Sequence, residues 1–587
     1  MARTPTVILG ISYGHGDSSA ALIVEGCLLA ACEEERLTRV KHYALFPTKA
    51  IEYCLKHANI SPKDVQVVAI ARKPWNAWSK RLGLAIQHPG LLSGKSNRGR
   101  HSQNDKEPLK ALLAKSGITK ASVVRVEHHL AHMYSARYMS DSEFVATLSF
   151  DGLGDFVSAA MGKAVGNDIQ ILNRVYFPHS VGFYYTAMTQ YLGFPYFGDE
   201  FKVMGLSSYG EPTYLPQLHE LIREDNEKFG FHLNLEAFPI LTKPMSFYIE
   251  NAQPYLDPFY NANFIRTLLG IPPRKKHEPL TKLHMNLAKS VQVRFEQIAS
   301  HMVNQLHTQV GGDTLALSGG CAHNSVWVGK IPQQTPYKNI FIAPASHDAG
   351  IAVGAAAKAA QVTVTPEGKH WGLMGQSHLD TNLEGNSTWE SKGIHRSTFS
   401  REEDLIHWMV EQLCHGKILG LFHGRMEFGP RALGSRSIIA DPRSPDMKDR
   451  LNSRVKHRES FRPFAASVLW ETQDDWFENA FFSPNMEAVF QVKPAKQKKI
   501  PAVVHADNSC RIQSVTEETQ PFYYRLIEAF GKKTGVPMII NTSFNDSEPI
   551  VCSQSDAMNC FLNTEMDALV IGFDTFSRVS SQIRKAG

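Results

Sequence analysis

The most distinctive spacing of chemically active residues in the sequence is that of two histidines, His128 and His132, in the segment EHHLAH. Side chains four residues apart lie on one face of a helix, so both imidazoles can reach a single metal ion. The neighbouring Ala131 and Met133 supply the apolar side that such a helix needs. The glutamate of HExxH is missing, which excludes the general base of a zinc protease. The pair therefore predicts a different metal site, with two structural histidines as the alternative.

Two imidazoles need further ligands to hold a metal ion, and carboxylate oxygens are suitable partners. Asp151 and Asp348 are the candidates, because each lies at a predicted strand end or a glycine turn. An aspartate in such a position also commonly caps a turn, and this stays the alternative for each residue taken alone.

A second chemistry is indicated between His423 and Arg462, where ten Lys/Arg and five Asp/Glu leave a net charge of +5. This equals the net charge of all 587 residues, so the rest of the chain is balanced. Arg431 and Arg436 stand in the Gly/Pro turn FGPRALGSR, where a guanidinium can bind two phosphate oxygens and glycine lets the backbone approach. A solvated helical face is the alternative for Lys448 and Arg450. Further downstream the sequence adds Arg511, Asn541, Thr542, Ser543 and Asn545.

Glycine-rich turns supply a weaker indication of phosphate binding. The turns at residues 14–19 and at Gly319–Gly320 can direct backbone N–H groups at phosphate oxygens, with the Ser18 hydroxyl as a further donor. Alone they do not define a nucleotide site.

The elements that position these residues follow from the pattern of apolar runs and turns. A strand at 7–12, a glycine-rich turn and a strand at 20–24 form a predicted hairpin, and the same pattern recurs at 144–161. The two hairpins suggest a duplicated unit. Later strands at 314–318 and 340–342 each precede a glycine turn, which favours an α/β fold with ligands at the strand ends.

Composition and organisation complete the sequence-based picture. A polar segment at 361–400 is predicted to link a first domain, residues 1–360, to a second α/β domain, residues 401–587. The eight cysteines form no CxxC pair, and no uncharged run reaches the ~18 residues of a membrane span. With no apolar signal segment at the N-terminus, these features predict a cytoplasmic protein that acts without a membrane.

Several ordered motifs resemble those of a known family. They are EEERLTRVKH, HHLAH, DGLGD, KVMGLSSYG, SGGCAHN, SHDAGIAVGAA, FGPRALGSRSI, SFRPFA and INTSFN. In this order they resemble the NodU/CmcH O-carbamoyltransferases, which include the tobramycin, cephem and nodulation-factor carbamoyltransferases. The resemblance extends from about Val7 to Gly572, nearly the whole chain.

The resemblance implies an actin-like ATPase (ASKHA) domain, similar to the tRNA threonylcarbamoyl transferases, followed by a YrdC-like α/β domain. It implies that the second domain uses carbamoyl phosphate and ATP to make carbamoyladenylate, which passes internally to the first domain. There a divalent metal, Fe²⁺ by resemblance with Mn²⁺ or Mg²⁺ as alternatives, helps a hydroxyl of a small natural product to attack it. The expected partner is this small molecule, with no nucleic acid, and a homodimer is compatible with the resemblance.

The resemblance also implies roles for individual residues. Metal ligands match His128, His132 and Asp348, with Asp151 as a further ligand or base. Catalytic positions match Asp151, His15, Lys456 and Arg462. Carbamoyl-phosphate contacts match Arg431, Lys456, Arg462, Arg511, Asn541 and Ser543. Nucleotide contacts match Asp17, Ser18, Lys202, Gly319, Gly320 and Asn324, and Lys41 matches a position near the acceptor.

One position departs from the family pattern. Relatives usually have His-Asp-Ala/Ser-Ala at the tip of the first hairpin, whereas Gly16 stands here in place of that histidine. Either His15 takes over from one residue earlier, or the acceptor is held differently. Two other functions remain open from the sequence: a tRNA-modifying threonylcarbamoyl transferase, which the balanced charge outside residues 423–462 disfavours, and a non-catalytic actin-like ATP-binding protein.

Overall fold

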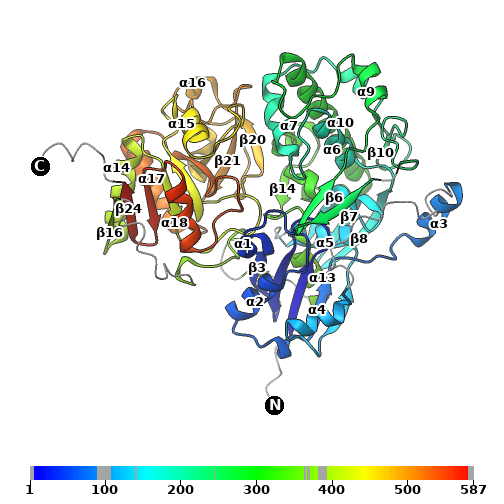
Figure 1. The fold of residues 1–587 in the computed structure, drawn as a ribbon, viewed down its shortest axis with the longest axis horizontal. Helices are drawn as coiled ribbons and strands as arrows, with labels where there is room; N and C mark the ends of the chain where they lie inside the picture. Colours follow the sequence, from blue (N-terminus) through cyan, green and yellow to red (C-terminus); the bar gives the residue numbers. More distant parts are fainter. Residues whose placement is uncertain are drawn as a thin grey trace, which may run out of the picture. The chain divides into compact units, whose positions relative to one another are not determined.

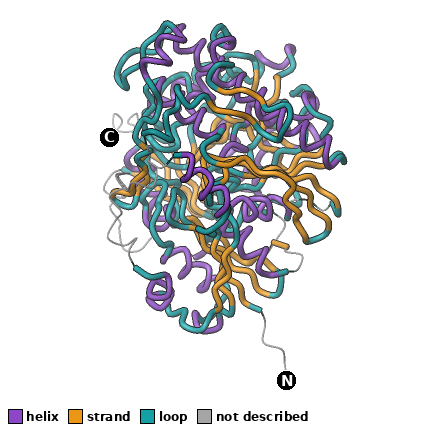
Figure 2. The backbone as a smooth tube through the Cα atoms, turned by 90° about the vertical axis from the view of Figure 1, so that its right-hand side faces the viewer, coloured by secondary structure: helices purple, strands orange, loops and turns teal. Residues whose placement is uncertain are grey.

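The computed structural model describes residues 6–88, 107–138, 140, 142–243, 245–361, 365–366, 370–380 and 393–578. The chain forms two compact units, Met1–Glu367 and Gly368–Gly587. Strands and helices alternate in both units, as the prediction of a mixed α/β fold requires (Figures 1 and 2). Within the described residues, no helix combines the length and apolar character needed to cross a bilayer.

The first sheet of unit 1 has the strand order β15-β3-β2-β1-β4-β5. Strands β1, β2 and β3 form an antiparallel meander, and β4 and β5 continue the sheet parallel to β1. The short edge strand β15 pairs with β3 in the parallel direction. The bounds are β1 Val7–Ser12, β2 Ser19–Val24, β3 Cys27–Glu33, β4 Val67–Ile70, β5 Ser122–Arg125 and β15 Thr365–Pro366.

The second sheet of unit 1 has the order β14-β13-β6-β7-β8. Strands β6, β7 and β8 form an antiparallel meander. Strands β13 and β14 continue the sheet on the other side of β6 and run parallel to it. The five core strands of the two sheets therefore share one topology, as the two predicted hairpins suggested. The bounds are β6 Phe144–Gly154, β7 Val157–Val165, β8 Asp168–Tyr176, β13 Thr314–Ser318 and β14 Asn339–Ile342.

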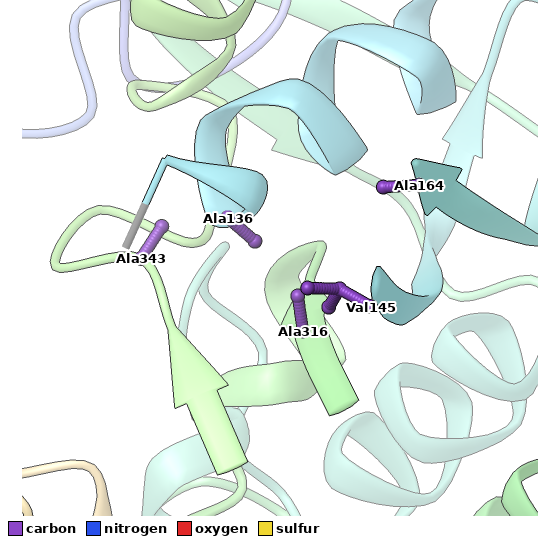
Figure 3. Close-up of a cluster of buried hydrophobic side chains, with 5 residues drawn as sticks. All are labelled: Ala136, Val145, Ala164, Ala316 and Ala343. Carbon is purple, nitrogen blue, oxygen red and sulfur yellow. The ribbon is translucent and has the colours of Figure 1, made fainter. Parts of the chain in front are cut away.

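Two helices of unit 1 pack against each other and connect the two sheets. Helix α5, His128–Arg137, lies on β6 and β13, and helix α13, Ile351–Ala360, lies on β1, β2 and β4 (Figure 1). Small side chains allow α5 to approach its sheet, and Figure 3 shows five of these side chains. They are Ala136, Val145, Ala164, Ala316 and Ala343.

The contact between α5 and α13 depends on Gly354. A Cβ atom at this position would lie 1.8 Å from the carbonyl oxygen of Ala131. We therefore expect Gly354→Ala to push the two helices apart and to lower the free energy of unfolding by about 2 kcal/mol or more. Chemical denaturation measures this loss. Gly83→Ala is the matched control, because a Cβ there meets nothing within 4 Å; a loss of equal size in the control would contradict the explanation.

Further helices surround the two sheets of unit 1. Their bounds are α1 Glu34–Thr38, α2 Thr48–His57, α3 Trp78–Gln87, α4 Leu109–Lys115, α6 Val181–Tyr191, α7 Glu200–Leu206, α8 Leu215–Leu218, α9 Ala262–Leu269, α10 Lys282–Val310, α11 Ser325–Val328 and α12 Ile331–Gln334. Two small hairpins complete the unit, with strands β9 Ile222–Glu224, β10 Phe231–Leu233, β11 Phe247–Glu250 and β12 Gln253–Leu256.

Unit 2 is built on a nine-stranded sheet of order β16-β24-β23-β17-β18-β22-β19-β21-β20. The strand bounds are β16 Ile394–Thr398, β17 Leu419–Phe422, β18 Arg436–Ala440, β19 Ala465–Leu469, β20 Ala488–Gln491, β21 Ser509–Val515, β22 Met538–Ser543, β23 Ala568–Ile571 and β24 Asp574–Arg578. The helices are α14 Glu402–Cys414, α15 Met447–Arg454, α16 Pro494–Gln497, α17 Pro521–Thr534 and α18 Gln554–Asn563.

The segment predicted as a linker, residues 361–400, contains regular structure. Strand β15 belongs to the first sheet of unit 1, and β16 pairs antiparallel with β24 at the edge of the sheet in unit 2. Only Ile394 of β16 is buried, so this edge strand lacks the apolar alternation that reveals a strand in a sequence. Residues 362–364, 367–369 and 381–392 of the predicted linker lie outside the described residues.

An aromatic stack in unit 2 contains a histidine that must stay neutral. The ring of His423 lies parallel to Phe522, with centroids 3.9 Å apart, and it also stacks with His378. Burial lowers the pKa of His423 to about 3, with His378 and Arg436 adding to the effect. Its protonation therefore favours the unfolded chain, where the pKa has its ordinary value of about 6.5.

This stack predicts a specific acid sensitivity. Because the folded pKa of His423 lies below the unfolded one, its contribution is present above about pH 6.5 and is lost as the pH falls. Between pH 7 and pH 5 the protein should lose about 2 kcal/mol of unfolding free energy through this residue. In His423→Phe, which keeps a stackable ring, the loss between these pH values should be smaller by that amount. Denaturation curves of both proteins at both pH values test this, and equal losses would contradict it.

Candidate functional site

Four predicted ligands come together in unit 1. The ligand atoms of His128, His132, Asp151 and Asp348 all lie within 4.8 Å of one another. The Nε2 atom of His132 is 3.2 Å from Asp151 Oδ2 and 3.4 Å from Asp348 Oδ1, and it is 3.1 Å from His128 Nε2. Helix α5 supplies both histidines, strand β6 supplies Asp151, and the turn between β14 and α13 supplies Asp348.

The first turn of α5 fixes the direction of the two histidines. The Glu127 carboxylate accepts hydrogen bonds from the backbone N–H groups of His129 and Leu130, and Asp155 Oδ2 accepts one from His128. Carboxylates at a helix N-terminus satisfy free N–H groups and favour the helix dipole. Neither Glu127 nor Asp155 was predicted as a site residue from the sequence, although both occur in the motifs EHHLAH and DGLGD.

The third histidine of the segment has a different environment. His129 Nδ1 lies 2.9 Å from Ser149 Oγ and its Nε2 lies 2.9 Å from the carbonyl oxygen of Val157. Burial holds the pKa of His129 well below its ordinary value, and His128 and His132 lower it further. His129 is therefore a neutral residue of the core rather than a fifth ligand.

The electrostatics of the four-residue cluster suit a cation. Burial opposes the charged form of His132, yet hydrogen bonds and attraction from Asp151 and Asp348 raise its pKa to about 9. The histidines in turn outweigh burial and lower the pKa of both aspartates. Asp348 Oδ1 is buried, and the Nε2 atoms of His132 and His128 lie 3.4 and 3.5 Å from it. Two imidazole nitrogens and two carboxylates that converge in this way fit a divalent metal of the Fe²⁺, Mn²⁺ or Zn²⁺ type.

His15 lies beside this cluster. Its Nδ1 atom is 2.8 Å from Asp348 Oδ2, and its ring packs edge to face on His128. The neighbouring Gly16 has no room for a side chain, because a Cβ there would lie 2.7 Å from the ring of Phe197. A histidine at position 16 would clash with this packing, whereas position 15 directs its imidazole at the cluster.

A second group of histidines and carboxylates adjoins the first. His42 Nδ1 is 2.8 Å from Asp17 Oδ1, and Glu35 accepts a hydrogen bond from the backbone N–H of His42. His347 Nε2 lies 3.4 Å from Glu33 Oε1 and 3.9 Å from Asp17 Oδ2. Only Asp17 of this group was predicted as a site residue. The others occur in recognised motifs, but their spacing along the chain gives no sign that they meet.

The residues expected at the nucleotide lie in varied environments. Ser18 is buried and its hydroxyl has no hydrogen-bond partner. Lys202 pairs with Asp199 at 2.8 Å. Gly319 and Gly320 follow β13, where Gly319 has a φ of 89°. Asn324 Oδ1 caps α11 by accepting from the N–H of Trp327.

Asn324 also exchanges side-chain hydrogen bonds with Gln292, so its amide is used within the protein. Lys41, expected near the acceptor, is exposed after α1.

In unit 2, strand register brings together residues that are far apart in the sequence. Ala465 of β19 pairs with Asn541 of β22 on one side and with Arg511 of β21 on the other. Residues directly opposite each other present their side chains on one face of the sheet. Ser543, two residues beyond Asn541, lies on that face as well.

A group of arginines surrounds this face. Burial lowers the pKa of Arg511 well below its ordinary value, and the charges of Arg431, Arg458 and Arg462 lower it further. The Nε–H of Arg511 is buried without a hydrogen-bond partner. Like charges at such a place repel each other, so a bound anion would relieve both the repulsion and the unpaired donor. Arg458 was not predicted, because it is one of many basic residues in the segment.

Two of the expected phosphate contacts are bonded inside the protein. Lys456 Nζ donates to oxygens of Ser543 and Asn545, at distances from 2.6 to 3.2 Å. Asn541 Nδ2 lies within 3.1 Å of oxygens of Ala432, Ser467 and Gln513, while its Oδ1 is buried without a partner. In the structure, Lys456 holds the turn after β22 and Asn541 holds the loop that contains Arg431.

Most of the chain matches the models of one protein family. Residues 7–357 match the family model "Carbamoyltransferase N-terminus", and residues 410–578 match "Carbamoyltransferase C-terminus". The nodulation protein NolNO of Sinorhizobium fredii is 35% identical over 95% of this chain and 78% of its own. Nodulation protein U of the same organism is 26% identical over 92% of this chain and 93% of its own. An uncharacterized protein of Synechocystis is 36% identical over 96% of both chains.

Similarities to solved structures are weaker. T. kodakarensis HypF shares 11% identity over 61% of this chain and 49% of its own, with a TM-score of 0.30. YeaZ from Pseudomonas aeruginosa covers 30% of this chain and 69% of its own, with a TM-score of 0.18. Scores this low carry no argument, whereas the two family models together cover most of the sequence. The chain therefore belongs to the carbamoyltransferase family that includes the nodulation proteins, and it is an enzyme of that family.

Proposed function

We propose that this enzyme is an ATP- and carbamoyl-phosphate-dependent O-carbamoyltransferase that acts on a hydroxyl of a small natural product. The observation that supports this most strongly is the presence of two chemically different clusters, one in each unit. Unit 1 contains imidazoles and carboxylates suited to a metal and to proton transfer, and unit 2 contains arginines suited to phosphate. Such a division suits a reaction whose two steps have different chemistry.

We assign the formation of carbamoyladenylate to unit 2, as a YrdC-like domain. Carbamoyl phosphate and water give carbamate and phosphate, and carbamate with ATP gives carbamoyladenylate and pyrophosphate. The guanidinium groups of Arg431, Arg462 and Arg511 bind phosphate oxygens and stabilise charge that develops on them. Ser543 and the free Oδ1 of Asn541 orient the carbamoyl group, while Lys456 supports the turn that presents Ser543.

We assign the transfer step to unit 1, as an actin-like ATPase fold, which the shared topology of its two sheets supports. The acceptor hydroxyl attacks the carbamoyl carbon and AMP leaves. His15 donates from Nδ1 to Asp348, so its Nε2 can take the proton of the hydroxyl. A divalent metal held by His128, His132, Asp151 and Asp348 would supply a Lewis acid that lowers the pKa of that hydroxyl. Fe²⁺ is the metal we propose, with Mn²⁺ or Mg²⁺ as alternatives.

The remaining site residues are assigned to the two ligands of unit 1. The glycine turns after β1 and β13, with Asp17, Ser18, Gly319 and Gly320, would receive the adenylate. Lys202 would supply a positive charge for the phosphate of the adenylate. Asn324 supports the turn after β13. Lys41 would approach the acceptor.

Mass spectrometry of candidate acceptors incubated with enzyme, ATP and carbamoyl phosphate tests this function. We expect a carbamoylated product only when both co-substrates are present, together with release of pyrophosphate. Pyrophosphate that does not depend on carbamoyl phosphate would contradict the scheme. A carbamoylated product formed without ATP would contradict it as well.

A further inference from the structure

A buried carboxylate lies at the centre of the loop that contains Arg431. This loop, residues 428–435, is the second part of the connection from β17 to β18 and contains no regular secondary structure. Glu427 is only 1% exposed. Its Oε1 atom accepts hydrogen bonds from the backbone N–H groups of Leu433, Ser435 and Arg436, at 2.8, 2.9 and 3.0 Å. The loop is thus folded around one side-chain oxygen.

The sequence explains why the loop needs such an acceptor. Glycine and proline in FGPRALGSR prevent a helix or a strand, so backbone N–H groups of the loop lack partners in a ladder. A carboxylate accepts without donating, and one oxygen can serve several N–H groups. The arrangement resembles a backbone nest for an anion, but here the anion belongs to the protein itself.

The opposite side of the loop is held as well. The carbonyl oxygen of Leu433 accepts hydrogen bonds from Gln513 Nε2 and Gln520 Nε2, at 2.9 and 2.8 Å. The carbonyl oxygen of Ala432 accepts one from Asn541 Nδ2 at 3.1 Å. The peptide group between Ala432 and Leu433 is therefore held from both sides, by Asn541 at its carbonyl oxygen and by Glu427 at its N–H group. Among these partners only Glu427 binds several N–H groups at once, so the fold of the loop depends on it most.

We propose that Glu427 is a positioning residue, which sets the place of the Arg431 guanidinium for phosphate binding without touching the phosphate. This inference rests on the proposed function, because it assumes that Arg431 binds carbamoyl phosphate. A displacement of about 1 Å in a binding group can cost about 10²-fold in rate. Loss of the three hydrogen bonds to Glu427 releases the loop and allows displacements of this size.

Three variants of Glu427 separate positioning from simple stability. Glu427→Gln keeps an acceptor oxygen and nearly the same volume, and Glu427→Asp keeps the charge but withdraws it by one methylene. Glu427→Ala removes the acceptor. The assay is pyrophosphate release with ATP and carbamoyl phosphate, with KM measured for each substrate. Circular dichroism checks the fold, and if Glu427→Ala does not fold, the Asp and Gln variants decide.

We expect KM for carbamoyl phosphate to rise about 10²-fold in Glu427→Ala and by a smaller factor in Glu427→Asp. KM for ATP should change little in these variants. In Glu427→Gln, KM for carbamoyl phosphate should stay close to the wild-type value. An equal rise in both KM values, or Asp and Gln variants that both behave as wild type, would overturn the positioning role.

Arg431→Ala is the control for the assumption beneath the proposal. If it impairs carbamoyl-phosphate use while the Glu427 variants do not, only the positioning role fails. If Arg431→Ala itself is without effect, the proposed function of the arginine cluster fails at this residue, and the positioning role fails with it.

Discussion

Replacing His132 by alanine is expected to lower the rate of carbamoyl transfer by about 10³-fold while carbamoyladenylate formation continues. Of the two histidines on α5, His132 lies closer to both Asp151 and Asp348, and its side chain is completely buried. Its loss removes one proposed ligand and the imidazole that lies within 3.4 Å of both carboxylates. The arginine cluster belongs to unit 2 and does not depend on this residue. Product formation and pyrophosphate release are measured on the same preparation.

A matched control is available on the same helix. His129 is equally buried, but its two nitrogen atoms bond to Ser149 and Val157. His129→Gln should lower stability and leave the metal content of the folded protein unchanged, whereas His132→Ala should lose the metal. Metal analysis of both variants distinguishes them. Full metal content in His132→Ala would remove this residue from the ligand set.

Replacing Arg511 by methionine is the second large expected effect. Methionine has a similar length but no charge, so it keeps the packing of β21 and removes the buried, partly unpaired guanidinium. We expect carbamoyladenylate formation to fall by about 10²- to 10³-fold, and transfer to fall with it. Arg511→Lys should recover only part of the rate, because an ammonium cannot bind two oxygens in the planar geometry of a guanidinium.

Arg454→Ala is the control for net charge. Arg454 lies in the same basic segment but pairs with Glu565 near the protein surface. The substitution Arg454→Ala should leave pyrophosphate release unchanged. An equal loss in Arg454→Ala and Arg511→Met would show that general positive charge, and not a phosphate site, explains the effect.

Local patterns in the sequence predicted the elements of unit 1 well. The two hairpins appear as β1–β2 and β6–β7, and the helical spacing of His128 and His132 appears as α5. Apolar periodicity determines these elements over short distances, so a single sequence is enough to find them. The edge strand β16 was missed for the same reason, since only one of its side chains is buried.

The site required information that no local pattern contains. Asn541 and Arg511 meet through Ala465, and this meeting depends on the register of three strands far apart in the chain. The pairing of His42 with Asp17 likewise joins residues of different elements. The sequence also could not show which side chains bond within the protein. Lys456 and Asn541 match phosphate-binding positions by resemblance, yet in the structure they donate hydrogen bonds to other residues of unit 2.

The central claim, that the two units perform successive half-reactions, is tested most directly by pyrophosphate release from His132→Ala. With ATP and carbamoyl phosphate present, this variant should release pyrophosphate at close to the wild-type rate and form the carbamoylated product about 10³-fold more slowly. Loss of pyrophosphate release together with the product would show that the two clusters do not act in separate steps. Normal product formation would show that His132 takes no part in transfer.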